Sequence, residues 1–308
     1  MNRTFKKLAA GLAACAMASL FATGASAADK VTIGLVQPNV EHPYRVAGVE
    51  RAKAWAAQHP NVELIVVDGR RDSAVQMAAV EDLIQRGVDI IVMSPNDSKA
   101  LTPVAETAKR AKIPLVIFDR KLAVDPSDYA AYVGAADIEM GRSAARFLAE
   151  KIGDKGTVIQ LEGTPGASAT LDRKKGFEEE MARHPQIKVV SYVGNYKLSD
   201  AVAVMEDAAT AHRGFAAVYG HNDSMATGAA KVVKERNLGD VPIIGIDGGK
   251  EACEGIASGA LAASIYYPTM FPEALDVAMK VLDKESVPKD TILETPVLTR
   301  ENLAQYCK

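Results

Sequence analysis

The chain has 308 residues, a formal net charge of −3 and charges of both signs along its length. This length is enough for two domains of ordinary size, and the lack of a basic block argues against nucleic acid as a partner. Neither of the two cysteines beyond residue 27 has a second ligand at a suitable spacing, which argues against a metal site.

The first 27 residues have the three-part pattern of a secretory signal peptide. Basic residues precede an Ala/Leu-rich apolar run that ends at Phe21, and the small residues Ala25-Ser26-Ala27 follow. We therefore expect a signal peptide over 1–27, with cleavage after Ala27. Leu12-Ala13-Ala14-Cys15 resembles a lipobox, but the apolar run continues past Cys15 and a better cleavage site follows, so a lipoprotein is the less favoured alternative.

The chain after residue 30 alternates between short apolar runs without polar positions and amphipathic helical segments. Runs of this kind are typical of strands buried on both faces of a parallel sheet. In the first half the expected strands cover 31–36, 62–67, 88–93 and 113–118, and the expected helices cover 46–58, 73–86 and 103–111. Asp72 or Ser73 is expected to cap the second helix, and Thr102 before Pro103 marks the start of the third.

Residues 129–134 are expected to lead into a second unit of the same kind. Its expected helices cover 138–151, a segment through Met181, and 199–211; its expected strands cover 157–161, 189–192, 216–219 and the run that ends at Asp247. A loop of small residues, 163–168, follows the first of these strands. Strand–helix alternation predicts parallel sheets with right-handed crossovers.

Two motifs recur in the two halves. Asn96-Asp97-Ser98 follows one strand and Asn222-Asp223-Ser224 follows another, and a strand that ends in aspartate comes 22 or 24 residues after the respective aspartate, at Asp119 and Asp247. Two similar lobes, each an α/β sandwich on a parallel sheet, explain this repeat most economically.

Polar residues gather just past the expected strand ends, where ligands of open α/β sheets bind. They are Asp119, Arg120, Asn222 and Asp247, with Arg45 and Arg173 in or just after loops at the same edge. Arg, Asp and Asn supply the paired donors and acceptors that vicinal hydroxyls require, and Tyr44, Phe118 and Tyr196 offer flat faces for a sugar ring. We therefore expect a binding site for a small hydroxylated molecule.

Structural roles compete with this interpretation. Asp97 and Asp223 are better explained as helix caps than as ligand contacts, and Asp119 with Arg120 could form an ion pair at the sheet edge. Two carboxylates across a cleft could be a glycosidase pair, but each has an arginine, a glycine turn or an asparagine nearby and nothing marks a nucleophile, so we expect no catalysis and no cofactor.

The ordered set of motifs resembles the type I periplasmic sugar-binding proteins, with the ribose and galactofuranose binders as the nearest relatives. The set comprises His42-Pro43-Tyr44-Arg45, Phe118-Asp119-Arg120, 172–177, His221-Asn222-Asp223-Ser224-Met225 and Gly245-Ile246-Asp247-Gly248, and it spans the mature chain. The resemblance implies a monomeric periplasmic receptor with two lobes and a three-crossing hinge. Such a receptor closes on a monosaccharide or related polyol and delivers it to an ABC permease.

The resemblance also implies boundaries and roles. The N-terminal lobe would comprise 28–135 plus 268–294 and the C-terminal lobe 136–267 plus 295–308, which places Cys253 and Cys307 in one lobe as candidate disulfide partners. Carried over by position, the ligand-binding set is His42, Tyr44, Arg45, Asp119, Arg120, Arg173, Tyr196, Asn222, Asp247 and Tyr267.

Two departures from the ribose binders concern the ligand. Arg45 stands where those proteins carry a second aromatic residue, and Tyr267 stands where they carry glutamine, so ribose itself is in doubt. Another aldose, a furanose, a polyol or an acidic sugar stays open. Two alternatives share the architecture: a repressor core, which export argues against, and a receptor that reports its ligand to a chemoreceptor or sensor kinase.

Overall fold

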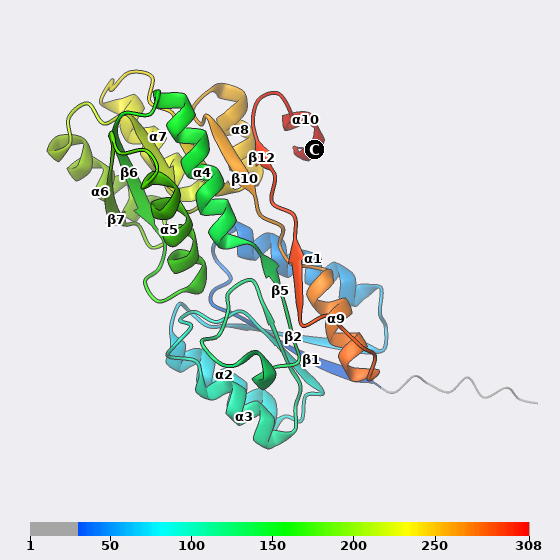
Figure 1. The fold of residues 1–308 in the computed structure, drawn as a ribbon. Helices are drawn as coiled ribbons and strands as arrows, with labels where there is room; N and C mark the ends of the chain where they lie inside the picture. Colours follow the sequence, from blue (N-terminus) through cyan, green and yellow to red (C-terminus); the bar gives the residue numbers. More distant parts are fainter. Residues whose placement is uncertain (1–29, 308) are drawn as a thin grey trace, which may run out of the picture.

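A computed structural model describes residues 30–307 as two α/β lobes, each built on a six-stranded sheet. In Figure 1 the first lobe lies below the second, and extended segments of the chain connect them. The strand orders are β11-β5-β4-β3-β1-β2 and β12-β10-β9-β8-β6-β7. Every one of the first five strands therefore has a counterpart in the second lobe, which confirms two similar α/β lobes on mostly parallel sheets.

The first lobe contains the strands and helices of the first half of the chain and two elements from near its end. Its strands are β1 (Val31–Gln37), β2 (Val62–Asp68), β3 (Ile90–Met93), β4 (Leu115–Phe118), β5 (Ala131–Ala135) and β11 (Asp290–Leu293). Its helices are α1 (Pro43–Ala57), α2 (Ser73–Gln85), α3 (Pro103–Ala111) and α9 (Glu273–Leu282), and a short 3-10 helix covers Pro126–Asp128.

The second lobe repeats the arrangement, except that its edge strand β12 is antiparallel to its neighbour. Its strands are β6 (Gly156–Glu162), β7 (Ile187–Val193), β8 (Ala217–Gly220), β9 (Ile243–Asp247), β10 (Ala263–Tyr266) and β12 (Val297–Leu298). Its helices are α4 (Asp137–Ile152), α5 (Ser168–Met181), α6 (Leu198–Ala211), α7 (Asp223–Glu235), α8 (Lys250–Ser258) and α10 (Leu303–Tyr306).

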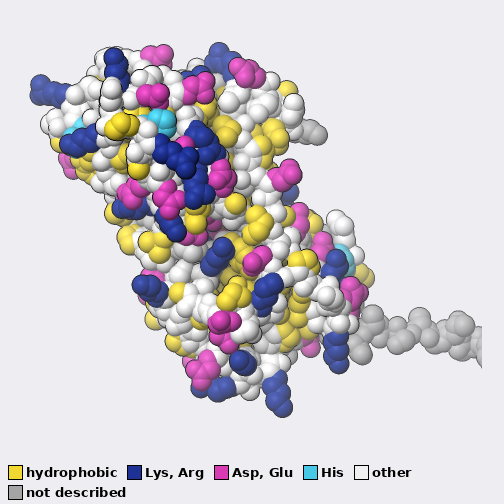
Figure 2. All heavy atoms as spheres, in the orientation of Figure 1, with side chains coloured by type: hydrophobic (Ala, Val, Ile, Leu, Met, Phe, Trp, Pro, Cys, Tyr) yellow, Lys and Arg dark blue, Asp and Glu magenta, His cyan; other side chains and the backbone are white. Residues whose placement is uncertain are grey.

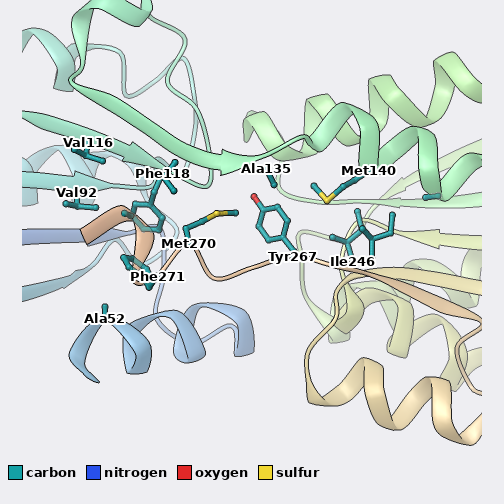
Figure 3. Packing of buried hydrophobic residues seen from close by; sticks show 14 of the residues in the cluster. Ala52, Val92, Val116, Phe118, Ala135, Met140, Ile246, Tyr267, Met270 and Phe271 are labelled. Carbon is teal, nitrogen blue, oxygen red and sulfur yellow. The ribbon is translucent and has the colours of Figure 1, made fainter. Parts of the chain in front are cut away.

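Helices cover both faces of each sheet, which is why the central strands read as continuous apolar runs. Helices α2 and α3 bury one face of the first sheet, and α6, α7 and α8 bury one face of the second. The remaining faces, covered by α1 with α9 and by α4 with α5, belong to a single apolar cluster that runs from one lobe into the other. Figure 3 shows Met270 and Tyr267 on the connecting segment between β10 and α9. Phe118 lies on the side of the first lobe, and Met140 and Ile246 lie on the side of the second.

The surface over α4 and α5 carries many charged side chains of both signs (Figure 2). Arg142 and Arg146 form salt bridges there with Glu139, Glu179 and Glu180. The exposed pairs among them, such as Arg142 with Glu179, contribute little to stability individually. Within residues 30–307, no helix has the length and hydropathy that a membrane crossing requires.

The structure corrects several local expectations. Helix α1 begins at Pro43 rather than Val46, because proline fits the first helical position, so Tyr44 and Arg45 lie on a helix and not in a loop. Arg173 lies within α5, in agreement with the helix expected through Met181. Asn222, not Asp223, caps α7, since its side chain accepts a hydrogen bond from the Met225 amide.

Two further expectations concern an aromatic face and the cysteines. Phe118 is fully buried in the core against Phe271 and offers no face to a ligand. Cys253 of α8 and Cys307 after α10 are joined by a disulfide bond, with their Cα atoms 5.8 Å apart. The signal peptide and its cleavage site lie outside the described residues.

Removal of the Phe177 ring tests the core of the second lobe. Phe177 is fully buried in α5 and stacks on Tyr219, with ring centroids 4.5 Å apart. We expect Phe177→Ala to lower the free energy of unfolding by about 3–5 kcal/mol, measured by denaturant titration. Phe147→Ala, at a partly buried position of α4 in the same lobe, should cost less than about 2 kcal/mol. Equal losses in the two variants would contradict this account of the core.

Candidate functional site

A polar cavity lies between the lobes, at the carboxyl ends of the central strands. It contains about 390 Å³ of empty space, including the part that opens to solvent. The residues that line it are Asn39, His42, Tyr44, Arg45, Arg71, Asp119, Arg120, Ala169, Arg173, Tyr196, Asn222, Asp247 and Tyr267. The structure therefore brings all ten residues of the ligand-binding set that the resemblance implies to one cavity, whereas Phe118 is not among the lining residues.

The carboxylate of Asp119, which directly follows β4, forms the polar centre of the first lobe's wall. Its Oδ2 atom accepts hydrogen bonds from Arg45 Nη2 at 2.5 Å and Ser94 Oγ at 2.6 Å. Its Oδ1 atom accepts a hydrogen bond from Tyr267 Oη at 2.8 Å. Tyr132 Oη donates to the Asp119 carbonyl at 2.7 Å, so both the side chain and the backbone of this residue are held.

These contacts keep Asp119 ionised. Burial alone would raise its pKa, but the charges of Arg45 and Arg120, together with the hydrogen bond from Ser94, outweigh burial and lower the pKa to about 2. Arg120 Nη1 itself donates to the Asn96 carbonyl at 3.2 Å, which fixes the second guanidinium beside the carboxylate.

A second buried ion pair supports the wall of the second lobe. Arg173 Nε donates to Asp137 Oδ1 at 2.8 Å, and Arg173 Nη1 donates to the His221 carbonyl at 2.6 Å. Both side chains of the pair are at most 5% exposed. Asp137 is the first residue of α4, so this pair joins α5 to the point where the chain enters the second lobe. Burial raises the pKa of Asp137 to about 6 despite the neighbouring guanidinium.

His42 and Asn222 meet across the cavity. Asn222 Nδ2 donates to His42 Nε2 at 2.7 Å, which requires the imidazole to be unprotonated at that nitrogen. Burial, followed by the charges of nearby arginines, lowers the pKa of His42 to about 3, in agreement with a neutral ring. Burial and then the charge of Asp223 raise the pKa of Asp247 well above its usual range.

Aromatic rings complete the walls. The Tyr44 and Tyr267 rings lie with centroids 5.3 Å apart, and Tyr44 Oη donates to the Pro268 carbonyl at 3.0 Å. The Arg173 guanidinium lies 4.7 Å from the centroid of Tyr267, and that of Arg120 lies 5.4 Å from the centroid of Tyr196. Flat polar and aromatic surfaces therefore alternate around the cavity.

The sequence interpretation missed three lining residues: Asn39, Arg71 and Ala169. Asn39 follows β1 and Arg71 follows β2, so the same strand-end criterion that selected Asp119 would have found them. Arg71 also donates to Glu41 Oε1 at 2.6 Å and, in the second lobe, to the Asn195 carbonyl at 3.4 Å. Ala169 carries no sequence signal, because it lines the cavity through its place in the first turn of α5.

The fold and the cavity define a two-lobed binding protein, and the comparison with known families agrees. The family model of the periplasmic binding protein domain matches residues 33–286, so the chain belongs to that family. It is 31% identical to the ribose import binding protein of Salmonella typhimurium over 92% of this chain and 94% of the relative. It is 32% identical to the galactofuranose-binding protein of Escherichia coli over 88% of each chain.

A solved structure supports the same assignment. The periplasmic binding component of the arabinose ABC transporter from Shewanella sp. ANA-3, bound to α- and β-L-arabinofuranose, superposes with a TM-score of 0.85. The identity is 32%, and the match covers 89% of this chain and 94% of the other. The expected resemblance to type I periplasmic sugar-binding proteins is thus confirmed, and these relatives are solute-binding proteins rather than enzymes.

The lowered pKa of Asp119 predicts an acid-sensitive contribution to stability. Because the folded-state pKa of about 2 lies below the unfolded value of 3.8, ionised Asp119 stabilises the fold above pH 4, and this contribution disappears as the pH falls toward 2. We expect the difference in unfolding free energy between wild type and Asp119→Asn to shrink by about 2 kcal/mol between pH 5 and pH 2. Urea titrations at several pH values measure it, and a difference that is constant over this range would contradict the assignment.

Proposed function

We propose that this protein captures a neutral monosaccharide or a related polyol between its lobes and delivers it to an ABC importer of the inner membrane. The observation that carries the proposal is the cavity itself, in which carboxylate, guanidinium and amide groups from both lobes face one small space. Each sugar hydroxyl both donates and accepts hydrogen bonds, so this mixture of groups suits it.

The ion pairs favour a neutral ligand. Arg45 is paired with Asp119 and Arg173 with Asp137, so these two arginines offer N–H donors while their charges are balanced within the protein. An acidic sugar would meet the Asp119 carboxylate, which stays ionised, at close range. The ligand leaves chemically unchanged, because the groups that face it are held in place by hydrogen bonds and none is set up as a nucleophile.

Strand pairing supports the proposed division into lobes, 28–135 plus 268–294 and 136–267 plus 295–308. Strand β11 joins β5 of the first sheet, and β12 joins β10 of the second, although they are neighbours in sequence. A ligand that contacts both lobes stabilises the closed arrangement over an open one by binding it more tightly. We further propose a periplasmic monomer that is exported by the signal peptide over 1–27.

A thermal-shift screen tests the proposed ligand class. The panel comprises L-arabinose, D-galactose, D-ribose, D-fructose, myo-inositol and D-galacturonate. A ligand at 100 times its Kd adds about 2.7 kcal/mol of stability, so a binder stands out clearly. Stabilisation by a neutral sugar or polyol supports the proposal. Stabilisation by the acid alone, or by no compound, contradicts it.

The side chains of Asp119 and Asp247 should dominate the affinity. We expect Asp119→Ala and Asp247→Ala each to weaken binding of the sugar found in the screen by about 2 kcal/mol or more, about thirtyfold, measured by isothermal titration calorimetry. Asp119→Ala frees Arg45 from its partner, and Asp247→Ala removes an acceptor from the opposite lobe. The control is Asp207→Ala on the exposed face of α6, which should bind like wild type. Unchanged affinity in both cavity variants would refute the site assignment.

A further inference from the structure

The small-residue loop before α5, together with Ser168 at the start of that helix, contacts the first lobe beside the cavity. The Ser98 amide donates to the Gly166 carbonyl at 3.0 Å, and the Lys121 amide donates to Ser168 Oγ at 2.7 Å. Ser98 and Lys121 follow β3 and β4 of the first lobe, whereas Gly166 and Ser168 belong to the second. These two hydrogen bonds therefore exist only when the lobes are together.

The two donors belong to one rigid part of the first lobe. Ser98 Oγ donates to the Lys121 carbonyl at 2.6 Å, and the Ala123 amide donates to the Ser98 carbonyl at 2.9 Å. The acceptors in turn adjoin the cavity, because Ala169 lines it and Arg173 follows one turn later on α5. A change in these contacts therefore alters how the two cavity walls face each other.

The contact has room for only a glycine at position 166. A Cβ atom there would lie 1.8 Å from Oδ2 and 2.7 Å from Cγ of Asp97 in the other lobe. The carboxylate cannot turn away cheaply, since its Oδ1 atom accepts hydrogen bonds from the Lys99 and Ala100 amides, both at 2.8 Å. The nearest Asp97 atoms to such a Cβ are all carboxylate atoms.

We propose that Gly166, with Ser168, forms a closure latch against the loops of Asp97 and Lys121, and that the missing side chain at position 166 is required for the lobes to close fully. The latch rests on the proposed function, since it deepens how the same cavity traps its ligand. Gly166 is a positioning residue: it acts on affinity through lobe closure and not through contact with the ligand.

The test combines a blocking variant with a matched control and a rescue. Gly166→Ala introduces the Cβ atom and also strains a backbone with φ of +81°. Gly239→Ala is the control, because Gly239 has φ of +86° in the same lobe and a Cβ atom there would meet nothing within 4 Å. Asp97→Ala combined with Gly166→Ala removes the clashing carboxylate and leaves the backbone strain in place.

Closure is measured directly on protein purified from the periplasm. Spin labels are attached to cysteines that replace the exposed residues Glu81 of α2 and Asp207 of α6. Double electron–electron resonance then measures the distance between the two lobes. Affinity is measured by calorimetry with whichever compound of the panel the wild type binds. Because apparent affinity falls with the population of the binding-competent form, we expect Gly166→Ala to lose the short distance and to bind at least about tenfold more weakly.

The other variants decide the cause. Gly239→Ala should close and bind like wild type, and the double variant should recover the short distance and the affinity of Asp97→Ala alone. Full closure of Gly166→Ala, or a double variant no better than Gly166→Ala, would overturn the latch. If Gly166→Ala does not fold, Ser168→Ala, which removes one of the two bonds, should still show a smaller closed population, and an unchanged population would overturn the proposal.

The ligand-free distances separate this proposal from the proposed function. If no compound of the panel binds the wild type, the function is wrong, and the latch is judged without ligand. It then requires a short-distance population in wild type that Gly166→Ala lacks. A wild type that never populates the short distance, with or without a bound compound, refutes the latch.

Discussion

The hydrogen bonds of Asp119 and Tyr267 hold the site together. Tyr267 Oη donates to the Asp119 carboxylate after β4, and the Tyr267 amide donates to the Asp247 carbonyl at the end of β9. Strands β4 and β9 occupy equivalent places in the two sheets, so one residue on the connecting segment joins the two equivalent strand ends. Because Arg45 and Arg120 keep the Asp119 carboxylate ionised, the hydrogen bond from Tyr267 is a charged one, which is stronger than a neutral hydrogen bond. Both side chains are buried, so water is largely excluded from this bond.

The backbone is strained at two of these residues, Asp119 and Asp247, and also at Tyr196 of the cavity wall. Asp119, Tyr196 and Asp247 have φ angles of 58°, 58° and 137°, and residues other than glycine rarely adopt positive φ angles of this size. Such conformations persist only where surrounding contacts impose them, and they are common at binding sites. At Asp119 these contacts are visible, since its amide donates to the Val133 carbonyl and its carbonyl accepts from Tyr132 Oη. The rigid sheet thus carries side chains that are already aimed into the cavity.

Most of the fold, and ten of the residues that line the cavity, could be predicted from the sequence. The fold follows from the hydrophobic periodicity, and most of these residues lie just past the ends of strands. The Asp119 and Asp247 motifs do end equivalent strands, and the Asn96 and Asn222 motifs do follow equivalent ones. What failed depended on tertiary contacts. Asp223 looked like a cap, yet its carboxylate accepts hydrogen bonds from Ser264 Oγ and the Gly248 amide inside the lobe. Nor could spacing reveal Asp137 as the partner of Arg173, because the pair forms between two helices.

The contacts between the lobes differ in kind on the two sides of the cavity. Near the connecting segments they are apolar and continuous with the core, through Tyr267 and Met270. At the loops of Ser98 and Gly166 they are two hydrogen bonds from backbone amides, Ser98 to the Gly166 carbonyl and Lys121 to Ser168 Oγ, and groups that part on opening can replace such bonds with bonds to water. Opening therefore costs least at the loops and most at the core that spans the lobes. This asymmetry favours rotation of the lobes about the connecting segments over their separation, because rotation can leave the apolar contacts of Tyr267 and Met270 in place.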